Sequence, residues 1–329
     1  FISFDQEDPL LWIHNKVEGK NEYSNLLYVP SKPPFDLWNR ESPRGVKLYI
    51  QRVFIMDDAS NFLPLYLRFI RGIVDASDLP LNVSRELLQE HQLVDVIKKS
   101  ITKRALESLK NLKEKSVDDY KKFWNQYGLV IKEGPAEDLE NRELIASLLL
   151  FSSSALDSQS EDHSLDDYIN RMKPEQNKIF YCVADTFEAA INSPHIEGLK
   201  SEGKEVLLLT DRIDEWLMAN LMEYKGKELA NVAKEEIKPN EEKKISKSDQ
   251  EIISKVKKHL GDKVSDVIVS SRLVDSASCI LLPKHEPGSQ LRKILEAAGQ
   301  DIASSQPIFE INLKHLSLIH ISEPTRLIG

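Results

Sequence analysis

The feature that most constrains the fold is a long amphipathic helix that follows a group of short strands. Leu93, Ile97, Ile101 and Ala105 recur at every fourth position, and lysine and arginine side chains occupy the other faces. This spacing predicts a helix of about six turns with a single apolar face. Because an apolar stripe of that length must be covered, we expect the helix to pack across a β-sheet.

Strands are predicted before this helix. Apolar residues at 12–17 and 23–29 flank a Glu-Gly-Lys-Asn turn and predict a hairpin. The β-branched and aromatic run 46–55 predicts one further strand. From Leu63 to Val74 the apolar spacing is helical, so a helix is predicted there as well.

Helices and strands alternate in the second half of the chain. Short helices are predicted at 117–127, 142–151 and 165–172, the last with Ser164 as its N-cap. A strand at 178–184, a helix at 186–200, a strand at 206–210 and a helix at 213–224 are predicted to follow. Because crossover helices join parallel strands, the two strands of this pattern should pair in parallel. The segment 225–250 is highly charged and is predicted to be a linker. A last module follows, with a helix at 252–260 that Gly261 should end, a second helix at 289–298, and strands at 264–273, 279–282 and 307–311.

Charge and cysteine content exclude several classes of protein. The 329 residues include 44 basic and 53 acidic side chains, a formal net charge of −9, whereas a general nucleic-acid binder is basic. The longest apolar run, 144–151, is far shorter than the roughly 20 residues that span a bilayer. Cys182 and Cys279 are too few for a disulfide framework. We therefore expect a cytoplasmic protein with neither nucleic-acid nor membrane partners, and the scattered histidines predict no metal site.

Both ends suggest that the chain is an interior piece of a longer protein. Residue 1 is Phe, and the residues that follow it have no signal-peptide pattern. Residues 316–329 alternate weakly and stop without a helix cap, so we expect this tail to be non-native.

The loop before the long helix combines features of a phosphate site. Asn82 is a residue type that caps helices, and Arg85 would lie in the first turn, where the helix dipole disfavours a cation. A bound anion would reverse that penalty, and Gln89, one turn later, could orient a water for phosphoryl transfer. The alternative is a salt bridge from Arg85 to Asp78 or Glu86. The sequence has no Gly-rich phosphate loop, which makes a stand-alone phosphate-binding enzyme the weaker interpretation.

Three blocks, at 45–58, 78–86 and 208–216, resemble the ninety-kilodalton heat-shock chaperones, most closely the bacterial form. The resemblance runs from residue 1 to about 315. Members of that family are homodimers with an N-terminal ATPase domain, a middle domain and a C-terminal dimerisation domain. The resemblance implies α/β and α+β folds, namely the middle domain and the start of the C-terminal domain.

The resemblance also implies divisions of the chain. They are a large α/β subdomain (1–125), a helical connector (126–172), a small α/β subdomain (173–238), a charged linker (239–250) and a truncated C-terminal domain (251–315).

For the site residues, the resemblance implies that Arg85 reaches the γ-phosphate of ATP, assisted by Gln89, with Asn82 in the same loop. ATP and Mg²⁺ would be bound by the ATPase domain, so we expect no cofactor in this chain and no enzyme activity from it alone. Phe54 would help to dock the ATPase domain, and its alternative role is that of a strand residue in the core.

Two client-binding surfaces are implied in the same way. One holds Glu215 and Trp216, with Ala219 where the bacterial pattern has an asparagine. An exposed Trp216 would favour client contact, whereas a buried one would indicate helix packing. The other is a helix face formed by Leu291, Ile294 and Leu295, which without the resemblance would be assigned to a core.

The expected function is therefore that of a fragment of an ATP-hydrolysing stress-response chaperone, which binds unfolded or partly folded clients and supplies Arg85 to ATP. The alternative is an ATP-independent interaction module for clients or co-chaperones. The full-length protein is expected to be a homodimer, and this chain alone a monomer.

Overall fold

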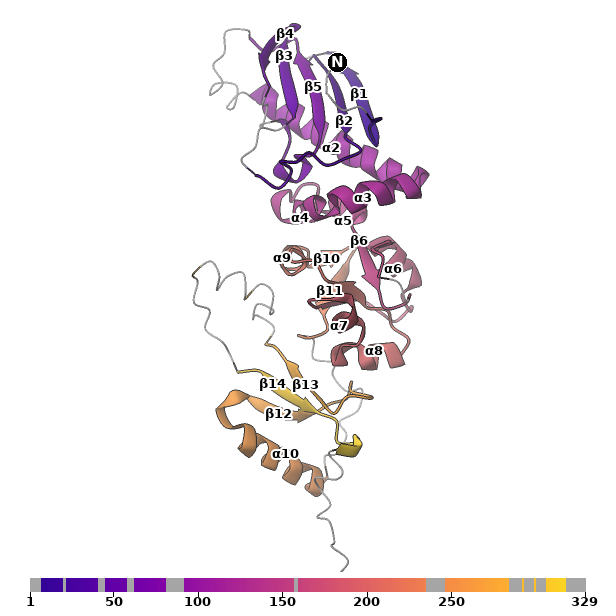
Figure 1. Cartoon of the computed structure of the whole chain (residues 1–329), viewed down its shortest axis with the longest axis vertical. Helices are drawn as coiled ribbons and strands as arrows, with labels where there is room; N and C mark the ends of the chain where they lie inside the picture. The colour runs from indigo at the N-terminus through magenta and orange to yellow at the C-terminus, as the bar shows by residue number, and fades with distance from the viewer. Residues whose placement is uncertain are drawn as a thin grey trace, which may run out of the picture. The chain divides into compact units, whose positions relative to one another are not determined.

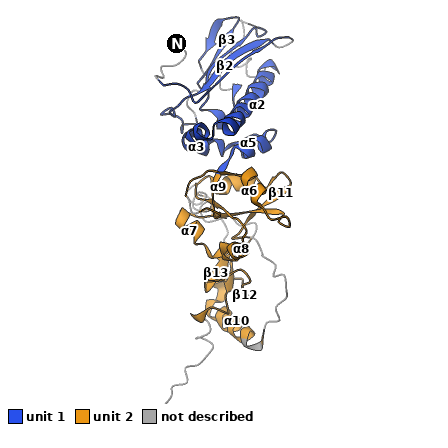
Figure 2. Cartoon of the chain, turned by 90° about the vertical axis from the view of Figure 1, so that its right-hand side faces the viewer, with its two compact units in different colours: residues 1–150 blue, residues 151–329 orange. Residues whose placement is uncertain are grey.

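The computed structural model describes residues 7–19, 22–40, 45–57, 62–80, 92–156, 159–234, 246–283 and 306–317, together with positions 292 and 299. The chain divides into two compact units, residues 1–150 and 151–329, which are coloured separately in Figure 2. The expected division at residue 125 falls inside a helix, α3 (Val117–Ile131).

The first unit is built on a five-stranded sheet with the order β1-β2-β5-β3-β4. The strands are β1 (Leu11–Val17), β2 (Tyr23–Val29), β3 (Val46–Ile50), β4 (Val53–Met56) and β5 (Arg71–Ala76). The predicted hairpin is confirmed as the antiparallel pair β1–β2. The predicted helix over 63–74 is wrong, because this segment forms a short 3-10 turn at Leu65–Leu67 and then the central strand β5.

Helix α2 (Gln92–Lys115) covers one face of this sheet (Figure 1). The four predicted apolar positions are all buried, as expected from their spacing, and the Tyr23 hydroxyl donates to Ser100 Oγ at 2.7 Å. Helices α3, α4 (Gly134–Glu137) and α5 (Arg142–Leu148) complete the unit. Phe69, Phe123 and Tyr127 form an aromatic cluster at α3, with ring centroids 4.6–5.6 Å apart.

The second unit begins with a six-stranded mixed sheet with the order β10-β11-β8-β9-β6-β7. The strands are β6 (Leu150–Ser153), β7 (His163–Ser164), β8 (Lys178–Val183), β9 (Leu207–Leu209), β10 (Glu223–Tyr224) and β11 (Lys227–Asn231). The predicted parallel pairing is confirmed for β8 and β9. Strand β11 lies inside the segment predicted to be a linker, so the sheet extends further along the chain than expected.

Helices of this unit are shorter than predicted. The helix expected over 186–200 is divided into α7 (Phe187–Ile191), a 3-10 turn at Pro194–Ile196 and α8 (Glu197–Ser201). Pro194 explains the break, since proline has no backbone N–H and its ring clashes with a preceding helical turn. By contrast, α6 (Leu165–Arg171) begins at the predicted cap, Ser164, which forms a capping box with Asp167.

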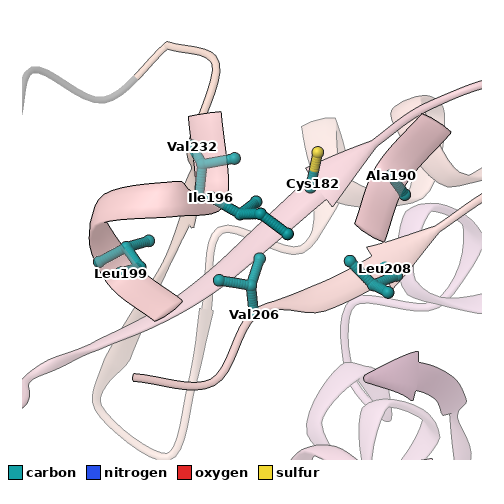
Figure 3. Close-up of a cluster of buried hydrophobic side chains, with 7 residues drawn as sticks. All are labelled: Cys182, Ala190, Ile196, Leu199, Val206, Leu208 and Val232. Atoms are coloured by element: carbon teal, nitrogen blue, oxygen red, sulfur yellow. The ribbon is translucent and has the colours of Figure 1, made fainter. Parts of the chain in front are cut away.

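A buried cluster between this sheet and its helices holds the second unit together (Figure 3). Its members are fully or almost fully buried: Cys182, Ala190, Ile196, Leu199, Val206, Leu208 and Val232. Both cysteines are free and buried. Burial raises the pKa of the Cys182 thiol to about 11.

The last module of the second unit is a three-stranded sheet with the order β12-β14-β13. Its strands are β12 (Asp266–Val269), β13 (Ser278–Leu281) and β14 (Ile308–Ile311), and α10 (Lys247–Leu260) packs on it through Ile252, Ile253 and Val256. Gly261, at φ 54°, ends α10 as predicted. The mixed α/β architecture expected from the sequence is confirmed.

Hydrogen bonds connect this module to the six-stranded sheet. Glu197 of α8 accepts from the backbone N–H groups of Val274, Asp275 and Ser276 at 2.7, 3.0 and 3.2 Å. Arg272 donates to the carbonyl oxygen of Val232 at 2.7 Å. A polar junction therefore joins the two sheets of the second unit.

Candidate functional site

The expected client-binding pair, Glu215 and Trp216, lies on α9 (Asp214–Asn220), which follows the buried strand β9. The fully buried Asp214 fixes the start of this helix, because its carboxylate accepts from the backbone N–H of Asp211 at 2.9 Å. Asn220 closes the other end by donating to the carbonyl oxygen of Trp216 at 2.8 Å. The two expected residues therefore stand on a helix fixed at both ends.

Trp216 is half-buried. It is therefore neither fully exposed, as expected for client contact, nor fully buried, as expected for helix packing. The next two residues, Leu217 and Met218, are buried. Ala219 is exposed, and Met222, just beyond the helix, is 71% exposed. Two apolar side chains of this short stretch, Trp216 in part and Met222 largely, therefore reach the surface.

Sequence reasoning missed Met222, because it placed residues 213–224 in one helix. The chain instead turns into the short hairpin of β10 and β11, through Lys225 and Gly226 at φ 48° and 73°. A Lys-Gly pair between two short alternating runs is a turn signal, and it could have identified the hairpin. The helix ends at Asn220, and Met222, between the helix and the hairpin, lies on the surface.

The acidic residue Glu215 precedes Trp216 on α9 and is partly exposed. Burial raises the pKa of Tyr181 on β8 to about 12; a hydrogen bond with Asn231 opposes that rise, and the charge of Glu215 adds to it. Tyr181 is therefore neutral at physiological pH, and Glu215 lies close enough to influence it. We call Glu215, Trp216, Ala219 and Met222 the α9 surface.

Phe54, the expected docking residue, lies on the edge strand β4 of the first unit. The single strand predicted over 46–55 is in fact the hairpin β3–β4, with Gln51 and Arg52 at φ 50° and 66°. Two consecutive residues with positive φ make the tight turn that suits the twist of a hairpin. The prediction missed this turn because neither residue is Gly, Asn or Asp, the usual signals.

The core interpretation of Phe54 is wrong, because its side chain is 53% exposed. It lies opposite Tyr49, on the face of the sheet away from the buried Leu48 and Ile50, and the two rings meet edge to face at 5.6 Å. Neighbouring Val53 is 51% exposed. The edge hairpin therefore exposes two neighbouring apolar side chains.

The expected phosphate-site residues Asn82, Arg85 and Gln89 lie outside the described residues. The chain that enters this loop is described: Asp78 accepts from the backbone N–H of Glu22 at 2.5 Å, and Leu79 is buried. The described chain is therefore anchored just after β5. The second expected client surface, Leu291, Ile294 and Leu295, also lies outside the described part of the chain.

Metal-binding clusters and membrane-spanning helices are both absent from the described residues. These residues contain no group of three or more His, Cys, Asp or Glu side chains that could hold a metal ion. Among the same residues, no helix is both long and apolar enough to cross a bilayer.

Comparisons of this chain with a family model, with curated proteins and with solved structures agree with one another. The family model described as Hsp90 protein matches residues 1–325, which includes part of the segment expected to be a non-native tail. The chaperone protein HtpG of Coxiella burnetii is 48% identical over 336 residues, covering 99% of this chain and 53% of that protein. HtpG of Pseudoalteromonas translucida is 47% identical over 331 residues, covering 98% of this chain and 52% of that protein. The chain spans about half the length of the curated relatives it matches.

A solved structure is also similar. The middle domain of the Plasmodium falciparum putative heat shock protein PF14_0417 aligns with a TM-score of 0.62 at 36% identity. The alignment covers 70% of this chain and 90% of that one.

Proposed function

Because the chain belongs to the Hsp90 protein family, we propose that it is the client-binding and ATPase-assisting part of a cytoplasmic, ATP-dependent chaperone. In this proposal, unfolded or partly folded proteins bind to the α9 surface. The observation that carries the proposal is that two apolar side chains close in sequence reach the surface: the indole of Trp216 is half-buried and Met222 is 71% exposed.

The chemistry of the α9 surface suits clients without a fixed structure. An indole ring offers a large apolar area with few rotatable bonds, so it loses little entropy when a client binds. Methionine is flexible and polarisable and adapts to different partners. Glu215 adds one negative charge, which would favour segments that combine apolar and basic residues.

The ATP-related part of the proposal concerns the first unit. Arg85 and Gln89 would contact the γ-phosphate of ATP held, with Mg²⁺, by an ATPase domain of the whole protein, and Asn82 would shape the loop that carries them. A guanidinium stabilises the charge that develops on a transferring phosphoryl group. Phe54, exposed on β4, would help to dock the ATPase domain.

The client-binding proposal can be tested with this chain and a permanently unfolded, fluorescently labelled protein. Trp216→Ala should weaken binding about tenfold, as expected for a central aromatic anchor. Because Trp216 is half-buried, a second variant is needed that leaves the packing unchanged. Met222→Gln removes an exposed apolar side chain and should weaken binding about fivefold.

Leu139→Gln provides the matched control, since Leu139 is 67% exposed but lies on the first unit. This variant should bind like the unmodified chain. Equal affinities for Met222→Gln and Leu139→Gln would remove the α9 surface from client binding.

The ATP-related proposal requires the full-length protein. Arg85→Ala should lower ATP hydrolysis by about a hundredfold or more, while Arg85→Lys should restore only part of it, because lysine lacks the planar fork of donors. Unchanged hydrolysis together with intact client binding would favour the alternative function, an ATP-independent module for clients or co-chaperones. We further propose that the whole protein is a homodimer and this chain a monomer, which light scattering of both would test.

A further inference from the structure

A cavity of about 280 Å³ opens on the second unit, away from the α9 surface. The end of α6, the residues after β6 and the loop after α8 form its walls. Four cations line it: Arg171, Lys173, Lys200 and Lys204. The single carboxylate of the lining is Glu205, so the cavity is positive on a chain of net charge −9.

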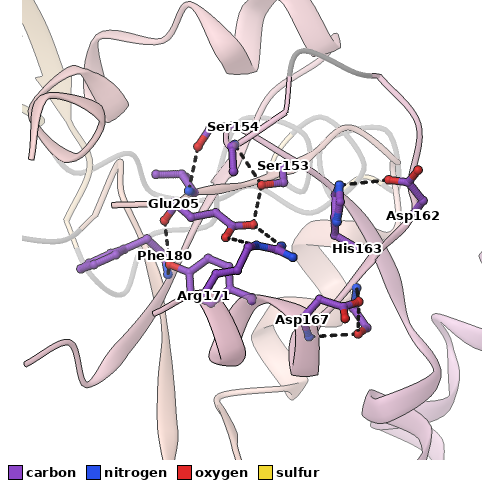
Figure 4. A network of polar contacts seen from close by, with 12 residues as sticks. Ser153, Ser154, Asp162, His163, Asp167, Arg171, Phe180 and Glu205 are labelled. Carbon is purple, nitrogen blue, oxygen red and sulfur yellow. Dashed lines mark hydrogen bonds and ion pairs between the residues drawn. The ribbon is translucent and has the colours of Figure 1, made fainter. Parts of the chain in front are cut away.

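Glu205 is already fully engaged by protein groups. Arg171 donates to its two oxygens through Nε and Nη2 at 2.9 and 2.7 Å, and Ser153 Oγ donates to it at 2.5 Å (Figure 4). Its side chain is only 10% exposed. The carboxylate therefore neutralises one cation and does not compete for the others.

The buried floor of the cavity is rigid. Tyr168 is fully buried, and its hydroxyl donates to the carbonyl oxygen of Glu205 at 2.7 Å. The same hydroxyl accepts from the backbone N–H of Phe180 and from Gln176 Nε2, both at 3.0 Å. A ligand in the cavity would meet a preorganised wall.

Several donors at the cavity are not used within the described part of the chain. Arg171 has five N–H donors, and the two on Nη1 have no acceptor among the residues described. The Ser154 hydroxyl accepts from the backbone N–H of Val206 at 2.9 Å and keeps its own proton to donate. Lys200 is exposed, and its ammonium contacts no acceptor in the regions that the structure describes.

A purely structural role explains only some of these cations. Lysine and arginine stabilise the C-terminal ends of helices, and Lys173 does so by donating to the carbonyl oxygen of Glu202. Lys204 pairs with the Glu202 carboxylate at 2.6 Å. Helix-end stabilisation does not account for the free donor of Ser154, which lines the same cavity.

We propose that this cavity binds the phosphoryl group of a small molecule, either inorganic phosphate or a small phosphate monoester. A dianion with several oxygens can accept from Arg171 Nη1, Ser154 and Lys200 together, whereas a carboxylate has only two oxygens and one charge. The volume lies near the lower end of the range for ligand pockets, which limits the ligand to a small one.

The test is a titration of the isotope-labelled chain with inorganic phosphate, glycerol 3-phosphate and acetate at constant ionic strength, followed by amide NMR shifts. Saturable shifts at Ser154, Gly203 and Lys204 are expected with at least one of the two phosphates, and which of them binds more tightly identifies the ligand. Acetate should bind about tenfold more weakly or not at all. No saturable shift with either phosphate, or equal affinity for acetate, would overturn the proposal.

Two variants and a matched control make the result specific. Lys200→Gln should weaken phosphate binding about fivefold, and Ser154→Ala about tenfold, the loss of one hydrogen bond to a charged group. Lys258→Gln is the control, because Lys258 is also exposed and also lies in the last turn of a helix of this unit. Equal weakening by Lys200→Gln and Lys258→Gln would reveal only general charge attraction and would contradict a built site.

Discussion

Replacing Arg272 with alanine should loosen the junction between the two sheets of the second unit. The guanidinium is 1% exposed and donates to both Glu310 oxygens, at 2.8 and 3.3 Å, while its third contact is the Val232 carbonyl oxygen at 2.7 Å. Glu310 is itself only 7% exposed. Alanine would therefore leave a buried carboxylate without its counter-charge and a buried carbonyl group without its donor.

The expected cost follows from these contacts. Removing one partner of a buried ion pair typically destabilises a protein by about 3–5 kcal/mol, mainly because the remaining charge is desolvated and uncompensated. About 1.4 kcal/mol corresponds to a factor of ten in an equilibrium constant. The fraction of molecules in which the contacts between the two sheets are broken should therefore rise about a hundredfold to several thousandfold. The double variant Arg272→Met with Glu310→Gln, which removes both charges, should recover a large part of that loss.

Hydrogen exchange followed by mass spectrometry is the suitable assay, because it reports the stability of each segment separately. Peptides from β13 and β14 should exchange faster by the factor given above, and peptides from the first unit should not change. Arg212→Met is the control, since Arg212 is an exposed arginine on the same unit. An acceleration below tenfold for Arg272→Ala, or no recovery in the double variant, would refute the argument that the ion pair holds the junction.

Three further predictions concern other parts of the chain. Burial of the imidazole lowers the pKa of His195 to about 4, and the positive charge of Arg272 adds to this effect. The unfolded state therefore binds more protons than the folded state between pH 4 and 6.5. The second unit should lose up to about 3 kcal/mol as the pH falls through that window, and urea unfolding of a His195→Asn variant at several pH values should show a flatter dependence. Gly72→Ala should destabilise the first unit by about 3 kcal/mol or more, because a Cβ at φ 142° would overlap the carbonyl oxygen of Leu26 on β2. Soluble expression of this variant with an unchanged urea midpoint would contradict the prediction. Ser164→Ala should cost about 1 kcal/mol by removing the cap of α6, measurable by thermal unfolding, whereas Ser160→Ala, on a hydroxyl outside the cap, should have almost no effect.

Local patterns predicted the elements whose stability depends on their own sequence. The four-residue spacing at 93–105 predicted α2, and Ser164 predicted the start of α6, because amphipathic faces and caps involve residues close in sequence. The parallel pair β8–β9 also followed, since a crossover helix leaves few alternatives.

Other elements were predicted wrongly because distant residues decide them. The segment containing Gly72 has helical apolar spacing, yet it forms the central strand β5 between β2 and β3. Gly72 allows this close approach, since its backbone passes next to Leu26 on β2. No property of residues 63–74 alone indicates that neighbour.

For the candidate site, the sequence by itself determined which residue types are present: an apolar ring at Trp216, an acid beside it and an aromatic side chain at Phe54. The resemblance of long blocks to a known family assigned them roles. Only the tertiary structure decided their exposure, because exposure depends on what packs against a side chain. Thus Phe54 on the edge strand β4 is 53% exposed, Met222 just beyond α9 is 71% exposed, and Trp216 is half-buried. The positive cavity was likewise invisible in the sequence, since its cations come from two segments, 171–173 and 200–204, that only the fold brings together.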